Sequence, residues 1–186
     1  MQSPPTPLGK RQSYCSHCGA DLSVAVPAGD NRLRYVCDGC GRVQYENPKL
    51  VVGCVATFEG RILLCKRAIA PRIGYWTLPA GFMELGESLA AAAARETLEE
   101  ACAEVRIDGL LASINVLTAG QVHVFFRARL IEPVYSAGAE SLDVQLMLPA
   151  EIPWAELAFT SNRIALEQYL SQTETGREFV WTGNAL

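Results

Sequence analysis

The sequence has no apolar run long enough to cross a bilayer, which takes about 20 residues, so we expect no membrane span. A basic excess is also absent: 16 Lys and Arg stand against 20 Asp and Glu, a formal charge of −4, which argues against a broad nucleic-acid footprint. Residues 1–14, MQSPPTPLGKRQSY, lack the apolar core of a secretory signal and predict a flexible leader.

The composition that remains is that of a globular protein. Hydrophobic residues make up 49% of the 186 positions, enough to bury a full core and to allow one domain plus a small module. Mild acidity is compatible with a metal site built from carboxylates. The spacing of the seven cysteines does not favour disulfides, so we expect a reduced, cytoplasmic protein.

Two CxxC pairs near the start predict a structural zinc site. The pairs are Cys15 with Cys18 and Cys37 with Cys40, each followed by a glycine that can take the left-handed backbone of a tight turn. Strand-like pieces between the pairs favour a zinc ribbon over residues 15–46. Two disulfides and free thiols are the alternatives. His17 is expected to be a bystander, since four sulfurs satisfy the ion.

The order of elements after the ribbon predicts a mixed β and α domain, of class α+β, over residues 47–172. A hairpin is expected with strands at 50–58 and 61–67 around Glu59 and Gly60, followed by a loop and a glutamate-rich helix. Further strands are expected at 104–117, 121–131 and 141–148, then a short helix after Pro149 or Pro153 and a final helix ending near Ser171. Residues 173–186 are expected to be a C-terminal tail.

The stretch GFMELGESLAAAAARETLEEAC, residues 81–102, predicts a helix that starts at the N-cap Ser88. Glu96, Glu99 and Glu100 are spaced i, i+3, i+4, which places them on one side. Oxygen ligands favour magnesium or manganese, although a solvated acidic face is the commoner reading of a charge run alone. We expect the opposite, small or apolar side to pack on a sheet: Ala91, Ala94, Leu98, Ala101, Cys102 and Val105.

The same stretch resembles the Nudix box, G-x5-E-x7-R-E-U-x-E-E-x-G-U, where U is bulky and apolar. The matching residues are Gly81, Glu87, Arg95, Glu96, Glu99 and Glu100. Thr97, Cys102 and Ala103 depart from the pattern. Cys102 replaces the glycine that would end the helix, so the pattern does not fix the residue at which the helix ends. We interpret this cysteine as a buried small hydrophobe.

The resemblance runs from about Lys49 to the final helix and implies an α/β/α sandwich with a mixed sheet that hydrolyses a diphosphate linked to another group. By this resemblance, Glu96, Glu99 and Glu100 bind magnesium or manganese, with the Gly81 carbonyl as a further ligand. Arg95 would orient a glutamate, and Glu87 would steady the loop before the helix. A box glutamate or Glu140 could act as general base.

Residues outside the box are candidates for substrate contact. Arg67 could meet phosphates, while Tyr75 and Trp76 could stack on an adenine or flavin ring or pack in the core. Glu140 has the alternative of a surface loop charge. His123 alternates with apolar residues and is expected to be a strand residue rather than a catalyst.

The zinc ribbon narrows the range of expected substrates. NADH pyrophosphatases also carry such a module, but their SQPWPFP-like run is missing here. The chain is more similar to the group of plant plastid FAD and ADP-ribose pyrophosphatases, in the segments NPKLVVGCVA, YWTLPAGFMELGES and AESLDVQL. This similarity implies FAD or ADP-ribose as the small-molecule nucleotide substrate and AMP as a product. The alternatives are an NADH pyrophosphatase and a non-catalytic, nucleotide-sensing or nucleic-acid-binding protein. We expect a homodimer, with the ribbon as a possible dimerisation module.

Overall fold

The computed structural model describes residues 12–185, so most of the expected leader, residues 1–14, lies outside the described part. The chain divides into two compact units between Pro48 and Lys49. A short β-bridge joins Tyr14 to Asp21, so the last residue of the expected leader already belongs to the smaller unit.

The smaller unit is a three-stranded antiparallel sheet with the order β1-β2-β3. Its strands are short: β1 spans Leu22–Ala25, β2 spans Arg34–Cys37 and β3 spans Val43–Gln44. A three-stranded sheet of this size buries little apolar surface, so its fold needs another source of stability.

The larger unit is built on a mixed eight-stranded sheet. Six strands follow the order β10-β5-β4-β9-β8-β11, and the other two, β6 and β7, pair with β5 and β4. Pairs β4–β9 and β8–β11 are parallel, and the other pairs are antiparallel. The strands are β4 Lys49–Phe58, β5 Arg61–Arg67, β6 Trp76–Thr77, β7 Ala80–Phe82, β8 Val105–Val116, β9 Gln121–Leu130, β10 Ser141–Met147 and β11 Trp181–Asn184.

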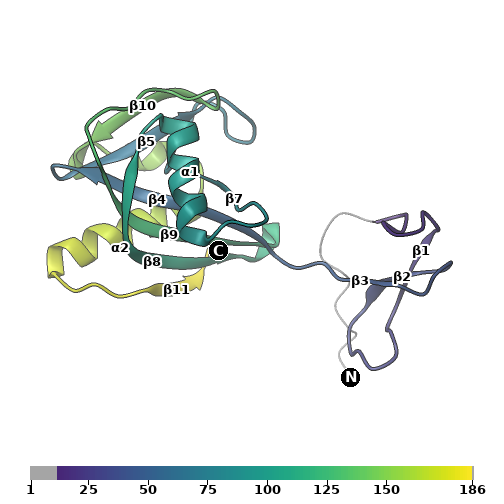
Figure 1. Ribbon diagram of the computed structural model, residues 1–186. Coiled ribbons are helices and arrows are strands. Elements are labelled where there is room, and N and C mark those ends of the chain that lie inside the picture. The colour runs from purple at the N-terminus through teal and green to yellow at the C-terminus, as the bar shows by residue number, and fades with distance from the viewer. Residues whose placement is uncertain (1–11, 186) are drawn as a thin grey trace. The chain divides into compact units, whose positions relative to one another are not determined.

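Helices cover both faces of this sheet, as Figure 1 shows for α1 (Leu89–Ala101) and α2 (Thr160–Thr175). Each face has its own core. The α1 side includes Val52, Cys54 and Phe126, whereas the α2 side includes Val55, Ile62 and Phe125. Because β4 lies inside the sheet, both of its faces are buried, which explains its nearly continuous apolar sequence. The α+β class and the α/β/α sandwich are confirmed.

The predicted hairpin is confirmed. Thr57 pairs with Ile62 and Phe58 with Arg61, leaving a two-residue turn. Glu59 and Gly60 both have positive φ, 48° and 78°, as a primed turn between twisted strands requires.

The end of the chain differs from the expectation. Residues 173–186, predicted to be a tail, include the last turn of α2 and strand β11, which pairs in parallel with β8 from Ala112 to Asn115. The prolines predicted to start a short helix instead begin two 3-10 turns, Pro149–Glu151 and Trp154–Glu156. A third 3-10 turn, Leu117–Ala119, joins β8 to β9.

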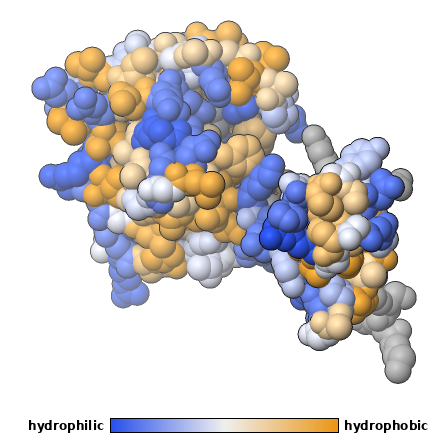
Figure 2. Space-filling model, turned by 45° about the vertical axis from the view of Figure 1, so that its right-hand side comes forward, coloured by the Kyte–Doolittle hydropathy of each residue, from blue (hydrophilic) through white to orange (hydrophobic). Residues whose placement is uncertain are grey.

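Among residues 12–185, no helix has both the length and the apolar character that crossing a bilayer requires. Large exposed hydrophobic side chains occur on both units, among them Tyr45, Leu85 and Ile131. Figure 2 shows hydrophobic and hydrophilic residues interleaved on the visible surface. Scattered exposure of this kind is normal for a protein surface.

Candidate active site and zinc site

The glutamate helix α1 begins and ends at defined residues. Ser88 is its N-cap, as predicted, and the Ser88 hydroxyl accepts a hydrogen bond from the Ala91 amide at 3.1 Å. Cys102 is the C-cap, in the left-handed conformation with φ 47°, and its amide donates to the Leu98 carbonyl. The helix therefore stops where the family pattern has glycine. Cys102 is exposed, so the prediction of a buried hydrophobe is wrong.

The packing face of α1 also differs from the prediction. Its buried residues are Ala92, Ala93, Glu96, Thr97, Glu100 and Ala101. Leu98, expected in the core, is 47% exposed. The prediction separated apolar from acidic sides, but Glu96 and Glu100 share a face with Ala92 and Ala93. Small alanines bring the helix close to the sheet and carry two carboxylates inward with them.

Arg95 gathers three of the box glutamates. Its Nε donates to Glu87 Oε1 at 2.7 Å, and its Nη1 donates to Glu96 Oε1 and Glu99 Oε2, both at 2.8 Å. Nη2 adds Glu87 Oε2 at 3.0 Å and the Phe82 carbonyl at 3.1 Å. Arg95 lowers the pKa of Glu87 by this pairing. One guanidinium thus fixes the loop before the helix and the acidic face of the helix together.

Gly81 lies against Glu96. A Cβ at this position would come within 2.2 Å of Glu96 Oε2, so any side chain at position 81 would displace the carboxylate. Burial raises the pKa of Glu96, and the Arg95 guanidinium opposes that shift. The glycine in the motif is therefore explained by space for a carboxylate, since its backbone is not left-handed.

Glu100 is the most enclosed of the acidic residues on this helix. It is 6% exposed, and its Oε2 has no hydrogen-bond partner among the described residues. Burial, with a smaller contribution from the charge on Glu96, raises the pKa of Glu100 to about 8. A buried, unpartnered carboxylate oxygen is unfavourable unless a cation or a donor reaches it.

The donor set fits a hard divalent cation. Glu96, Glu99, Glu100 and the Gly81 carbonyl offer oxygen atoms only, which suits magnesium or manganese. In the described part of the chain the carboxylates are not gathered at one point. Glu96 and Glu99 turn to Arg95 instead, and Glu100 Oε2 remains free to accept a ligand.

The charges of Arg67 and Glu140 influence this carboxylate group. Among the effects on the pKa of Glu100, the smaller ones come from Arg67, which lowers it, and Glu140, which raises it. The Glu140 carbonyl accepts from the Ala68 amide at 2.8 Å, and Arg67 Nε donates to the Pro71 carbonyl at 2.8 Å. Two of the residues predicted to contact substrate therefore act electrostatically on a predicted metal ligand.

The two aromatic candidates behave differently. Trp76 is 7% exposed and belongs to the core on the α2 side, which favours the packing alternative over stacking on a ligand. Tyr75 is 37% exposed and lies beneath the Arg72 guanidinium, 5.2 Å from the ring centroid. Tyr75 is thus the more exposed of the two candidate rings. His123 is a strand residue, as expected, buried and bonded to Ser161 and Gln121, both at 2.9 Å.

Sequence reasoning missed Gly138, which docks the loop before β10 onto α1. Its amide donates to the Glu100 carbonyl at 3.0 Å, and the Ser136 amide donates to the Ala101 carbonyl at 2.9 Å. These bonds satisfy carbonyls at the helix end. A Cβ at Gly138 would lie 1.8 Å from the Glu99 carbonyl oxygen. The glycine in GAES was the available signal, but its partner is distant in sequence.

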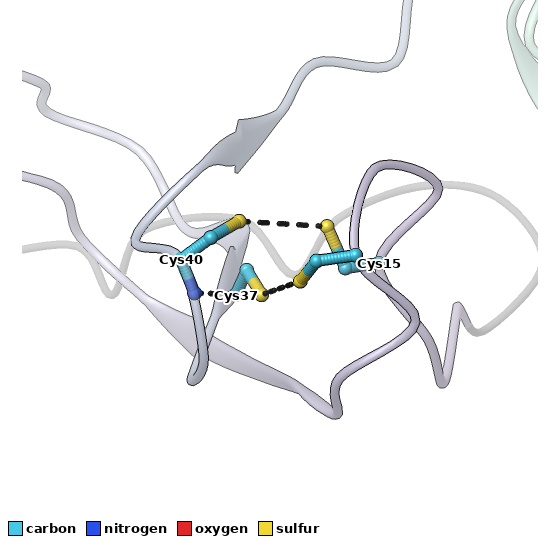
Figure 3. A group of neighbouring side chains, drawn as sticks. Cys15, Cys37 and Cys40 are labelled. Atoms are coloured by element: carbon cyan, nitrogen blue, oxygen red, sulfur yellow. Dashed lines mark hydrogen bonds between the residues drawn. The ribbon is translucent and has the colours of Figure 1, made fainter.

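The four cysteines of the smaller unit converge. All four sulfurs lie within 4.8 Å of one another, with Cys15 and Cys40 at 3.9 Å and Cys18 and Cys37 at 3.4 Å. Tetrahedral zinc with bonds of about 2.3 Å places sulfurs about 3.8 Å apart. Figure 3 shows the side chains of two loops pointing toward one another. The donor set fits a closed structural zinc site, and His17 is exposed beside it.

Backbone amides support the sulfurs. The His17 amide donates to Cys15 Sγ at 3.4 Å, and the Cys40 amide donates to Cys37 Sγ at 3.3 Å. Gly19 and Gly41 have φ of 75° and 70°, the conformation predicted for the residue after each pair. All seven cysteines are free of disulfides, so the disulfide alternative is not adopted.

Comparison with known proteins agrees with the two units. Residues 13–46 match the family model described as Nudix N-terminal, and residues 47–168 match the one described as NUDIX domain. A crystal structure of a Nudix hydrolase from Nitrosomonas europaea is 43% identical with a TM-score of 0.88, covering 94% of this chain and 100% of that one. An ADP-ribose pyrophosphatase from Streptococcus suis shares the fold at 20% identity, with a TM-score of 0.60, over 74% of this chain and 100% of its own.

Two curated relatives are each 34% identical. The NAD-capped RNA hydrolase NudC of Photobacterium profundum matches over 95 residues, 51% of this chain and 34% of that protein. A MutT-like protein of Streptomyces ambofaciens matches over 102 residues, 55% of this chain and 64% of that protein. The chain thus covers between a third and two thirds of these relatives. On the family matches, the box geometry and the four-sulfur cluster, the chain belongs to the Nudix hydrolase family, with a zinc-ribbon module before its Nudix domain.

Proposed function

We propose that the protein is a pyrophosphatase, dependent on magnesium or manganese, that hydrolyses the diphosphate of a nucleoside-diphosphate-linked compound and releases AMP. FAD and ADP-ribose are the leading substrates. The observation that carries this proposal is the unpartnered, buried Glu100 Oε2 beside Glu96 and Glu99, with Gly81 leaving space for the carboxylates.

A bound divalent cation would neutralise the diphosphate oxygens and acidify water for attack on phosphorus. The chain's own residues would do the rest. Glu96, Glu99 and Glu100 would hold the cation, with the Gly81 carbonyl as a further ligand. Arg95 keeps Glu96 and Glu99 in place through Nη1, and Glu87 keeps Arg95 in place.

Residues around the carboxylates would hold the substrate and move a proton. The charge of Arg67 lowers the pKa of Glu100, and Arg67 would meet a phosphate oxygen. Glu140 is exposed on the loop that Gly138 fixes to α1, and it is a candidate general base that accepts the proton of the attacking water. Tyr75 would face the adenine or flavin ring. Trp76, the next residue, would support Tyr75 by packing in the core.

A substrate panel tests the proposal. FAD, ADP-ribose, NADH and nucleoside triphosphates are incubated with magnesium, and the products are identified. FAD should give FMN and AMP, and ADP-ribose should give AMP and ribose 5-phosphate. Glu99→Gln and Glu100→Gln should lose turnover while folding is retained. Unchanged turnover in both variants would refute the site.

A second candidate is an NADH pyrophosphatase, favoured by the similarity to two proteins named NAD-capped RNA hydrolase NudC. The same panel separates it, because NADH would then give reduced nicotinamide mononucleotide and AMP faster than FAD is cut. A nucleotide-sensing or nucleic-acid-binding protein without catalysis is the remaining alternative, and a filter-binding assay with DNA and RNA beside the panel distinguishes it.

The four sulfurs support zinc as a purely structural ion, and we further propose a homodimer acting in the cytoplasm. Sizing the protein by light scattering, with residues 1–45 present and removed, tests whether the ribbon mediates dimerisation. A monomer in both forms would contradict the dimer.

A further inference from the structure

Ser141, at the first position of β10, is a buried polar residue without a bonding partner. It is 9% exposed, and its hydroxyl makes no hydrogen bond in the described chain. Only three buried side-chain polar atoms in residues 12–185 lack a partner, and the Ser141 hydroxyl and Glu100 Oε2 are two of them. Since such groups are rare and unfavourable, two of them in one region need a common explanation.

Main-chain hydrogen bonds connect the two residues that carry these orphaned atoms: the Gly138 amide donates to the Glu100 carbonyl at 3.0 Å, and the Ser141 amide donates to the Gly138 carbonyl at 3.1 Å. Burial raises the pKa of Cys65, the Glu100 carboxylate raises it further, and the Ser141 hydroxyl opposes the shift. Cys65 is on β5 and packs in the core on the α1 side. The turn before β10 thus fixes Ser141 to the end of α1 that carries Glu100, and both side chains influence the same buried thiol.

A β-bulge directs Ser141 to this side of the sheet. In the register of β10 with β5, Val144 pairs with Cys65 and Asp143 with Lys66, but Ser141 pairs with Arg67, so one residue is extra. Strict alternation would place Ser141 and Val144 on opposite faces. Both are buried, because the extra residue turns Ser141 inward.

We propose that Ser141 is a positioning residue for the cation site of the proposed function: its hydroxyl donates to Glu100, directly or through one water, when that carboxylate binds a divalent cation. A carboxylate that ligates a metal is normally held by a hydrogen bond from a second residue. Arg95 serves Glu96 and Glu99 in this way but not Glu100. Ser141 is an unpartnered buried hydroxyl on the turn that is hydrogen-bonded to the Glu100 backbone.

The test compares Mn²⁺ affinity and cation-free stability in the zinc-loaded, full-length protein. Ser141→Ala should bind Mn²⁺ about tenfold more weakly than wild type. The affinity is measured from the electron paramagnetic resonance signal of free Mn²⁺. Its Tm without added Mn²⁺ should be unchanged or higher, because the lost hydroxyl had no partner. Ser141→Thr keeps the hydroxyl and should restore the affinity.

Ser161→Ala is the matched control. Ser161 is also a buried serine, but it lies on α2 and bonds His123. This variant should lower Tm and leave Mn²⁺ affinity unchanged. Equal Mn²⁺ affinities in Ser141→Ala and wild type overturn the inference alone, as does a Tm loss or failure to fold in Ser141→Ala. Absence of Mn²⁺ binding to wild type overturns the proposed function together with it.

Discussion

Arg95 and Glu87 form a two-point ion pair, with Nε and Nη2 of the guanidinium reaching Oε1 and Oε2 of the carboxylate at 2.7 and 3.0 Å. This leaves Nη1 for the helix glutamates. Only a planar fork can serve the loop residue and the helix face at once, since an ammonium offers no fixed geometry.

Arg95→Lys should therefore keep the charge and lose the geometry. We expect Mn²⁺ affinity or turnover to fall by about 10–100-fold, as for other residues that orient metal ligands, with little loss of helix content by circular dichroism. Arg163→Lys is the control, because Arg163 makes an exposed i,i+4 pair with Glu167 on α2. A similar effect of both substitutions would contradict the orienting role.

Glu100 should make the cation-free protein less stable at alkaline pH. Its folded pKa, about 8, is above the unfolded value, so its stabilising contribution is complete below pH 4.5 and is lost as pH rises toward 8. Burial lowers the pKa of His123 to about 4, so the contribution of His123 to stability increases with pH up to about pH 6.5. Above pH 6.5 His123 no longer contributes, and the difference between wild type and Glu100→Gln reports Glu100.

Between pH 6.5 and 8, the free energy of unfolding should fall by about 1–2 kcal/mol in wild type without added divalent cation. Urea unfolding measures it. Glu100→Gln should flatten this slope, and added magnesium should reduce it, because the cation binds the ionised form. A slope that is equal in wild type and Glu100→Gln would show that the carboxyl ionises without strain.

The four-sulfur cluster should hold one zinc ion per chain. Cys37→Ser removes a buried sulfur, so zinc measured by inductively coupled plasma mass spectrometry should be lost, together with the fold of the smaller unit. Cys102→Ser is the control and should keep its zinc, since Cys102 is on α1. Full zinc content in Cys37→Ser would exclude the cluster as the site.

Cys102→Gly should stabilise the protein. A non-glycine residue in the left-handed conformation costs about 1 kcal/mol, and glycine removes that strain at a helix end. Cys102→Ala, which keeps the Cβ, should bring no gain in a denaturant titration. Equal stabilities of the glycine and alanine variants would show that the backbone here is unstrained.

Gly138→Ala should move the loop before β10 away from α1, because the new methyl group would overlap the Glu99 carbonyl. We expect a loss of about 1–3 kcal/mol in unfolding free energy. Gly109→Ala is the control, since the nearest atom to a Cβ there is an Arg127 nitrogen at 4.0 Å. A harmless Gly138→Ala would mean that the loop is not fixed by this contact.

Local sequence signals predicted much of the structure. Ser88, the Glu59–Gly60 turn and the CxxC glycines act within a few residues of themselves, so spacing alone predicted them. The inward face of α1 could not be predicted by separating polar from apolar residues, because the buried positions include Glu96 and Glu100. Ser141 depends on a bulge in the pairing of two strands, and β11 on a parallel partner, neither of which has a local sequence signature.

The short strand β11 also has a consequence for self-association. It covers β8 only from Ala112 to Asn115, so the first half of β8 has a free edge in the described structure. That half carries Arg106 and Asp108, which pair with each other at 3.3 Å, and its pairing with β9 shifts register between Ile107 and Gly109. Charges and an irregular register discourage the addition of another strand at this edge. The free edge of β8 is therefore protected against aggregation although no strand covers it.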